Sequence, residues 1–444
     1  MIVLQEKLCR AVESRWMMLA FTLFACAATA FSFEHYAIPV FILAMLVILI
    51  VSPNFLDILL PILLLNALAF RTTGQSEMLA KHVWLAFPVA AAIVLHFVLH
   101  RRPFVIGKSF YPLLAVSVAL LLGGVGSVTV TEYFHFGSLY YTFFLGVGMI
   151  FFYLWMRSRI FSTDAYDAKD RFMSVLLLMG IYSSFIIWEH AFRTLLAFGE
   201  MKVPVAPNDL CELILFAIPA AFYFAVKNYK YLVLGFVLYF SMVPARSLSA
   251  LFFGALLIAF CLWYVFCYRP GHRALTVLIT VACVCSALLI AWKADILSSA
   301  GFERFFLDEE NGRLSLFRKY AERFLEYPVF GGGMGMEIDD ATFMGYPWAH
   351  NYILQILGSL GIVGALAYGY QFVVRIRLMF SRIDFFRGAL SLCYLGIFSI
   401  SMLQPGEFCP MPYELLAVCL FVFLEMTENG DVPTHSLDRR YFAS

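Results

Sequence analysis

Long apolar runs, repeated along almost the whole chain, constrain this sequence more than any other feature. The hydrocarbon core of a bilayer is about 30 Å thick, so a helix that crosses it needs about 20 mostly apolar residues. Only 14% of the 444 residues are charged, whereas a soluble domain carries about 25%. Because water does not reach the bilayer core, a spanning segment must satisfy its own backbone hydrogen bonds, as a helix does. The sequence therefore predicts an all-α polytopic membrane protein.

We expect about 12–14 transmembrane helices, and about fourteen is the preferred count. The apolar runs lie at about 16–33, 36–51, 53–70, 83–98, 110–131, 138–156, 172–191, 209–226, 230–243, 247–268, 274–292, 350–373, 386–403 and 411–426. The expected organisation is an N-terminal transmembrane bundle (1–292), a long outer loop (293–349), and C-terminal transmembrane helices with a short tail (350–444).

Basic residues orient these helices, because Lys and Arg are enriched in cytoplasmic connections. With the N-terminus inside, most basic residues fall in inner connections, including Arg171, Arg375 and Arg387. The short outer loops hold only Arg71, Lys81, Arg193, Lys202 and Arg246. We therefore expect both termini in the cytoplasm and the segment 293–349 on the outer face.

An amphipathic helix is predicted in the outer loop, over residues 313–327, and is expected to lie on the membrane surface. Its apolar stripe consists of Leu314, Phe317, Ala321, Phe324 and Leu325. Its polar faces consist of Arg313, Arg318, Lys319, Glu322 and Arg323. The basic side is interpreted either as a solvated face or as a site for a lipid-linked phosphate, which the planar guanidinium suits.

A glycine-rich segment, 331–335, follows this helix and is too flexible to be helical. Its backbone N–H groups could hold an anion, or the segment could be a re-entrant turn. No Walker lysine follows it and no strand precedes it, so it is not a phosphate-binding P-loop. The ten cysteines include no CxxC pair, and we expect neither a metal nor another cofactor.

His350 and Asn351 stand where the apolar run resumes, at the outer end of the span 350–373. A histidine there is either a hydrogen-bonded polar anchor or a general base, since imidazole titrates near neutrality. A polar anchor is the commoner role, and the place of His350 beside the basic cluster adds support to the second interpretation. Arg193 and Arg246 are outer-loop cations that either reach lipid headgroups or bind an anionic substrate. Asn208 opens a span, next to an aspartate that can cap it.

Residues 313–364 resemble the membrane family of O-antigen ligases and O-antigen polymerases. The resemblance consists of Arg313, then YPVFGGGMG, then HNYILQILGSLGIVG. It matches the family's arginine, P-x-x-G-x-G-x, and H-N-x-x-L-Q-x-L-x-x-x-G-x-x-G pattern. Asn208 after a proline and Arg246 at the mouth of a span are weaker similarities.

The resemblance implies inverting, metal-independent transfer of a glycan from undecaprenyl diphosphate to a sugar hydroxyl at the periplasmic face. His350 would be the base or the acceptor-orienting histidine. Arg313 and Arg246 would bind the diphosphate, and Arg193 is carried over by its location. The candidate substrate-positioning residues are Asn351, Arg318 and Asn208.

Several functions remain open from the sequence. A ligase would use lipid A-core as its glycolipid acceptor, whereas a polymerase would use a second lipid-linked repeat unit. A polysaccharide-lipid flippase or a structural membrane subunit are alternatives of other classes. An enzyme is preferred to a transporter, because the cations cluster at helix ends and not within spans. The motif is shared by ligases and polymerases, and a ligase-type enzyme of the bacterial inner membrane is the interpretation adopted. Its expected partners are the lipid-linked donor, the acceptor and the bilayer, without nucleic acid.

Overall fold

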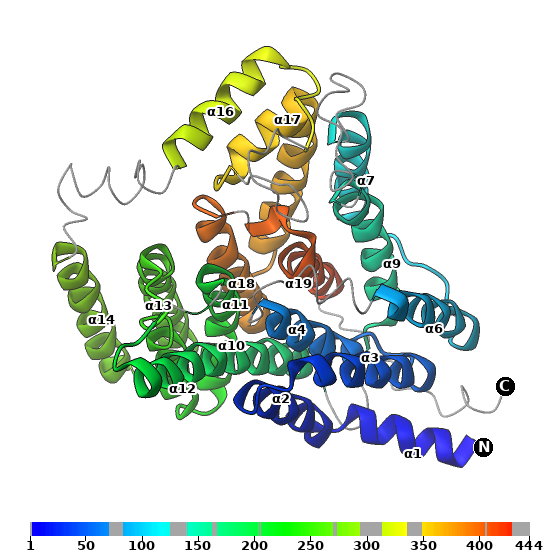
Figure 1. The fold of residues 1–444 in the computed structure, drawn as a ribbon, viewed down its shortest axis with the longest axis horizontal. Helices are drawn as coiled ribbons and strands as arrows, with labels where there is room; N and C mark the ends of the chain where they lie inside the picture. The colour runs from blue at the N-terminus through cyan, green and yellow to red at the C-terminus, as the bar shows by residue number, and fades with distance from the viewer. Residues whose placement is uncertain are drawn as a thin grey trace. The chain divides into compact units, whose positions relative to one another are not determined.

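A computed structural model shows a chain whose regular elements, in the part described, are all helical (Figure 1). The described residues form sixteen α-helices and several short 3-10 and π-helical turns. The described residues are 2–70, 83–124, 139, 141–161, 167–202, 204, 206–269, 273–293, 313–334, 349–404 and 406–428. Most of the predicted outer loop (294–312 and 335–348) and the predicted cytoplasmic tail after 428 lie outside them.

Five helices of the described ranges are long and apolar enough to cross a membrane. They are α3 (Glu34–Val51), α10 (Ala168–Phe198), α11 (Pro207–Lys227), α13 (Leu248–Tyr268) and α17 (Tyr352–Phe380). A sixth candidate is the bent pair of α1 (Ile2–Glu13) and α2 (Arg15–Ala30), which turns by 61° between its two parts. The protein is thus a multi-pass membrane protein, and the count of about fourteen stays a prediction.

The described helices form two units, and the boundaries of these units cut through α9 (Met149–Arg159) and α13. The first unit, 1–105, 155–251 and 429–444, contains α1, α2 and α3, α4 (Leu56–Phe70), α6 (Ala86–Leu99), α10, α11 and α12 (Tyr231–Phe240). Within it, α11 lies along α10 and is buried over most of its length. The three-part division predicted from the sequence stays a prediction.

The second unit, 106–154 and 252–428, carries the C-terminal half of the chain. Its elements are α7 (Phe110–Ala119), α14 (Arg273–Lys293), α16 (Arg313–Glu326), α17, α18 (Phe385–Ser401), α19 (Leu415–Met426) and the turns at Leu120–Gly124, Phe143–Gly148, Gly406–Phe408 and Pro410–Glu414. An apolar core joins α7 to α17 through Val116, Leu120, Ile356 and Leu360.

Two helices extend beyond the spans predicted for them, because each contains a buried, charge-paired arginine. α10 was expected at 172–191 but begins at Ala168, and Arg171 on it forms a buried ion pair with Asp57 of α4. Its other end runs to Phe198, so Arg193 lies in the helix and not in an outer loop. Removing a charged arginine from water destabilises a membrane helix, and an ion pair with a carboxylate reduces that penalty.

Arg375 is the second case, because α17 continues past the predicted end at 373 to Phe380. Its guanidinium is 4% exposed and binds two carboxylates, Glu407 and Glu414, the latter at 2.6 Å. The hydroxyl of Tyr394 lies 3.3 Å from it. Arg375 is therefore a buried charge-paired residue within a helix and not a residue of a connecting segment, where the sequence analysis counted it.

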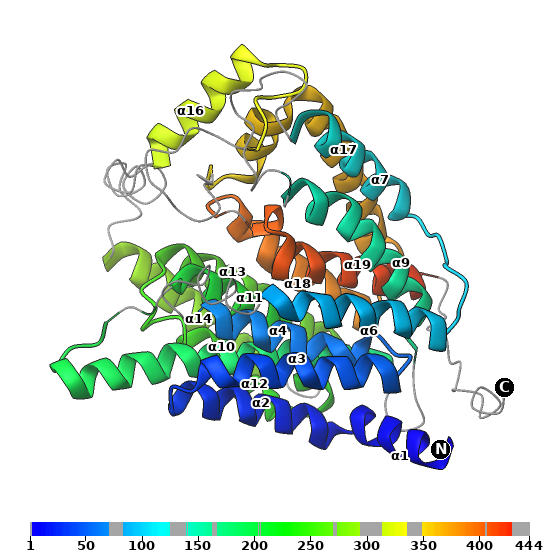
Figure 2. The same cartoon turned by 45° about the vertical axis from the view of Figure 1, so that its right-hand side comes forward.

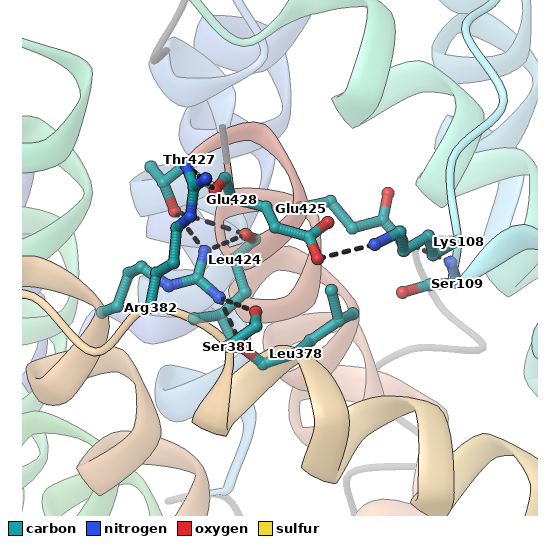
Figure 3. Close-up of polar contacts among 10 residues, drawn as sticks. Lys108, Ser109, Leu378, Ser381, Arg382, Leu424, Glu425, Thr427 and Glu428 are labelled. Carbon is teal, nitrogen blue, oxygen red and sulfur yellow. Dashed lines mark hydrogen bonds and ion pairs between the residues drawn. The ribbon is translucent and has the colours of Figure 1, made fainter. Parts of the chain in front are cut away.

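Arg387, near the start of α18, joins the ends of α17 and α19 in the second unit, and Figure 3 labels its partners Leu378, Ser381, Leu424 and Thr427. Arg387 is fully buried and donates hydrogen bonds to the carbonyl of Leu378 on α17 and the carbonyl of Leu424 on α19. It also donates to the hydroxyls of Thr427 (3.0 Å) and Ser381 (2.8 Å). One guanidinium thereby satisfies carbonyls that the C-terminal turns of two helices leave open.

Replacing Arg387 by Met should therefore destabilise the second unit. The loss of charge-assisted hydrogen bonds to buried carbonyls should cost at least about 2 kcal/mol. Thermal unfolding of the purified protein in detergent measures the change. Arg382→Met is the matched control, because Arg382 is exposed at the same junction and makes one 3.5 Å contact with the Glu428 carbonyl. Equal melting temperatures for the two variants would contradict this role.

Candidate functional site

The helix α16 packs against the first part of α17, and the two lie side by side in both views (Figures 1 and 2). Tyr320 is 1% exposed, and its ring lies against Gly358, where an added Cβ would come within 2.6 Å of it. The Tyr320 oxygen accepts a hydrogen bond from Gln355 at 3.2 Å. Burial raises the pKa of Tyr320, so its hydroxyl stays neutral.

One residue of the basic face of α16 is buried, unlike the prediction. Arg323 was expected on the solvated basic face, but it is 7% exposed and donates to the Gly332 carbonyl at 2.9 Å. That prediction used spacing along the helix alone, whereas a non-helical turn left a buried carbonyl that an arginine could satisfy. Leu325 of the apolar stripe is 77% exposed, and the placement of that stripe on the membrane surface stays a prediction.

The glycine-rich segment hydrogen-bonds to the protein through its own N–H groups. Gly332 and Gly333 donate to the carbonyls of Gly358 and Ser359, each at 3.0 Å. Met334 donates to the Gly124 carbonyl at 2.7 Å. The hypothesis of an anion cradle is therefore wrong for residues 331–334, since these donors are already engaged, and the alternative, a turn, holds. Gly335 lies outside the described residues.

The same segment accompanies a break in α17. Gly361 has φ 62° and ψ −155°, a conformation that only glycine adopts without strain. Beyond it, Ile362 donates to the Pro328 carbonyl at 2.8 Å and Val363 to the Val329 carbonyl at 3.1 Å. The expected span 350–373 is thus not one continuous helix, and the first part of α17, next to His350, is a separate short helix.

His350 lies at the start of this short helix and is half-buried. Its backbone has φ 51°, in the left-handed region that non-glycine residues rarely adopt. Its Nδ1 lies 3.1 Å from Oε1 of Gln404, a residue in the turn after α18. Asn351 caps α17 by accepting from the Leu354 N–H at 3.0 Å, and it donates to the Met402 carbonyl at 3.2 Å.

Gln355, on the first turn of α17, hydrogen-bonds to the residue before His350 and to two hydroxyl groups. Its Oε1 accepts from the N–H of Ala349, the residue before His350, at 2.7 Å. Its Nε2 lies 3.2 Å from both the Tyr320 oxygen and the Ser359 hydroxyl. Sequence reasoning did not assign Gln355 or Tyr320 a role. The one available signal was that Gln355 and Ser359 put polar groups on one face of an apolar helix.

In the first unit, the residue after Arg246 contacts the predicted residue Asn208. The hydroxyl of Ser247, next to Arg246, donates to Asn208 Oδ1 at 2.7 Å. Arg246 is exposed, has φ 55° and donates to the Met201 carbonyl at 3.3 Å. Its guanidinium therefore lies at the surface and contacts the segment that leads into α11.

Arg193 has a structural explanation in the same unit. Its guanidinium forms an ion pair with Glu189 at 2.5 Å. It donates to the Ser32 hydroxyl at 2.8 Å and to the Ala30 carbonyl at 3.0 Å. These contacts cap the C-terminus of α2, so its proposed role with diphosphate stays a prediction.

Arg313 is the first residue of α16, and Arg318 is exposed on the same helix. Across the described ranges, no group of three or more His, Cys, Asp or Glu side chains could hold a metal ion. A cavity of about 210 Å³ lies between α17 and α18, lined by apolar side chains such as Tyr352, Ile356 and Phe398. One of its lining residues, Tyr352, is two positions after His350 in the chain. The lining is apolar enough to accommodate a hydrocarbon chain.

These features define a polytopic α-helical membrane protein whose polar groups gather where helices end or break. Residues 214–369 match the profile of the O-antigen ligase family, and this stretch is an O-antigen ligase family domain. Membership of this domain in the family implies a membrane enzyme that transfers glycans, with lipid-linked glycans as its class of substrate. No curated protein and no solved structure matches the chain.

The family match separates the predicted site residues into two groups. Those inside it are Arg246, Arg313, Arg318, His350 and Asn351. Arg193 and Asn208 precede it. The match also covers Tyr320, Gln355 and Gly361, and so includes the broken helix and the residues that support His350.

Gly361→Ala should disrupt the site, because an added Cβ would lie 2.5 Å from the Val329 carbonyl oxygen and in a backbone conformation closed to alanine. We expect a loss of at least about 2 kcal/mol in stability and loss of glycan transfer. Gly369→Ala on the same helix, where a Cβ would meet nothing within 4 Å, should keep both. Melting temperature and transfer activity of the two variants test this, and a fully active Gly361→Ala would rule the break out as a requirement.

Proposed function

We propose that the protein transfers a glycan from undecaprenyl diphosphate to a sugar hydroxyl of lipid A-core, at the periplasmic face of the bacterial inner membrane. The observation that carries this proposal is His350, held by hydrogen bonds at the start of the broken helix within the O-antigen ligase family domain. The proposed orientation places both termini in the cytoplasm, as the distribution of basic residues predicts.

In the reaction, the acceptor oxygen attacks C1 of the donor sugar from the side opposite the diphosphate. The C1–O bond to the phosphate breaks, its electron pair leaves with the diphosphate, and the configuration at C1 inverts. His350 takes the proton of the acceptor hydroxyl, because an imidazole at neutral pH accepts a proton and a bare hydroxyl is a poor nucleophile. Both substrates are confined to one membrane surface, which supplies proximity.

Arginines are proposed to stabilise the departing diphosphate. Negative charge grows on the phosphate oxygens as the C1–O bond breaks, so preorganised cations lower the barrier. Arg246 is the best supported candidate, because it is exposed and has a strained backbone, and because its neighbour Ser247 hydrogen-bonds to Asn208 at the start of α11. Arg313 lies on α16, whose packing on α17 ties it to the helix that carries His350.

Backbone strain supports the same residues independently of the family match. Strained backbone persists only where the surrounding structure enforces it and is often found at functional sites. Among the described residues, the non-glycine residues with positive φ are Ser32, Ala206, Arg246, His350 and Arg382. Two of these five are the proposed base and a proposed diphosphate ligand.

The cavity between α17 and α18 supports a lipid-linked substrate. Its walls are apolar along most of their length, and Gln371 and Arg375 supply the polar part of the lining. A hydrocarbon chain loses no hydrogen bonds when it enters such a space, so burial of its surface is favourable. The proposed donor carries such a chain attached directly to its diphosphate.

Replacing His350 by Ala should lower glycan transfer by at least about 100-fold, because general-base catalysis contributes about 10²–10⁴-fold. The measurement is surface polysaccharide attached to lipid A-core in a host without its own enzyme, at matched membrane levels. His35→Ala is the control, since His35 is an exposed histidine at the start of α3. Loss of chain length without loss of attachment would instead indicate a polymerase, and unchanged transfer would refute this mechanism.

Arg246→Ala should reduce transfer by about 10²–10³-fold, as expected for the loss of one preorganised charge donor. Arg246→Lys should recover only part of it, because an ammonium lacks the planar fork that binds two phosphate oxygens. Transfer rates in vesicles with purified lipid-linked donor give both values. Arg382→Ala serves as the control, since it also removes an exposed arginine with positive φ. Equal rates for the two alanine variants would exclude Arg246 from the site.

A further inference from the structure

The turn between α18 and Gly406–Phe408 contacts the His350–Asn351 pair at two adjacent points. The Met402 carbonyl accepts from Asn351 Nδ2 at 3.2 Å. Gln404, two residues on, places its Oε1 3.1 Å from His350 Nδ1. Gln404 is 3% exposed, so water does not compete for this contact. His350 is therefore held by a residue far along the chain and outside the family match, which ends at 369.

The chemistry of this contact fixes the proton of the imidazole. A carboxamide oxygen can only accept a hydrogen bond, so His350 Nδ1 must donate one and carry the proton. A neutral imidazole has a single N–H, and Nε2 is then the nitrogen with the lone pair. Without such a partner, a free imidazole side chain favours the opposite tautomer, in which Nε2 carries the proton.

The burial of Gln404 favours a role in this contact over a role in stability. Its Nε2 is buried and has no hydrogen-bond partner within the described residues. A buried N–H without a partner destabilises a fold, and an apolar side chain of similar shape would avoid that penalty. The contact of its Oε1 with His350 explains a glutamine here, because an apolar residue could not make it.

We propose that Gln404 is the positioning residue of His350, which it holds in the Nδ1–H tautomer with Nε2 as the proton acceptor. This proposal rests on the proposed function, in which His350 is the base. When the proton of the acceptor hydroxyl moves to Nε2, the imidazole becomes a cation with two N–H groups. The Nδ1–H still donates to Gln404, so the hydrogen bond is kept and strengthened as the charge forms.

Nitrogen-15 NMR of the histidine-labelled full-length protein without substrate tests the tautomer directly. The nine histidines are separated by comparison with His350→Gln, which removes one set of signals. Wild type should show the Nδ1–H form of His350. Gln404→Glu keeps an acceptor and should keep this form, whereas Gln404→Met keeps the shape but should convert His350 to the Nε2–H form. Wild-type His350 in the Nε2–H form would overturn the proposal.

Transfer kinetics provide the second measurement. Gln404→Met should lower kcat by about 10–100-fold with KM nearly unchanged, because the base is lost but substrate contacts are not. Gln404→Glu should stay within about tenfold of wild type, since the orienting acceptor is restored. A Gln404→Met enzyme with wild-type kcat would show that the contact is not used in the reaction.

Gln371→Met is the matched control for the NMR measurement. Gln371 is equally buried, at 3%, in the same unit, but its amide donates to Glu414 at 3.3 Å and not to His350. It should leave the His350 signal unchanged, and a shift there would mean that the NMR change reports general destabilisation. Because the NMR is read without substrate, the two proposals fail separately. An Nδ1–H tautomer together with full activity of His350→Ala would refute the function and keep the contact.

Discussion

The hydrogen bonds between the glycine-rich turn and the broken part of α17 are the constraint on which the candidate site depends. A helix that breaks at Gly361 exposes carbonyls and N–H groups that a membrane cannot satisfy. The turn supplies the partners: Gly332 and Gly333 donate to carbonyls before the break, and Ile362 and Val363 donate back to Pro328 and Val329. The break lets the first part of α17 form a separate short helix that starts beside His350.

Elsewhere in the chain, buried arginines pair with polar groups that would otherwise lack partners, and each of these contacts lies within one unit. Arg387 satisfies carbonyls at two helix ends, and Arg375 neutralises two carboxylates. Arg323 satisfies a carbonyl of the glycine-rich turn. In a chain with so few charges, these arginines are placed where backbone or carboxylate groups would otherwise be left without partners. Arg246 differs from them, because it is exposed at the surface of its unit.

The sequence predicted the features that depend on local pattern. Apolar runs gave the helical membrane class, and the spacing around Arg313 gave a helix that the structure has at Arg313–Glu326. The His350–Asn351 pair and the glycine run resembled the family that the profile match bears out. The ends of α10 and α17 were predicted wrongly, because hydropathy counts Arg171 and Arg375 as loop residues and cannot register their partners Asp57 and Glu407.

By itself, the sequence determined that this is a membrane protein with an O-antigen ligase family domain, because hydropathy and motif spacing are properties of neighbouring residues. Only the tertiary structure decided which donors are already used. In the folded protein, the N–H groups of residues 331–334 donate hydrogen bonds to backbone carbonyls, and Arg323 is buried. The tertiary structure also brought Gln404 to within 3.1 Å of His350. Contacts between residues far apart in the chain depend on how helices pack, and no local pattern in one sequence encodes that packing.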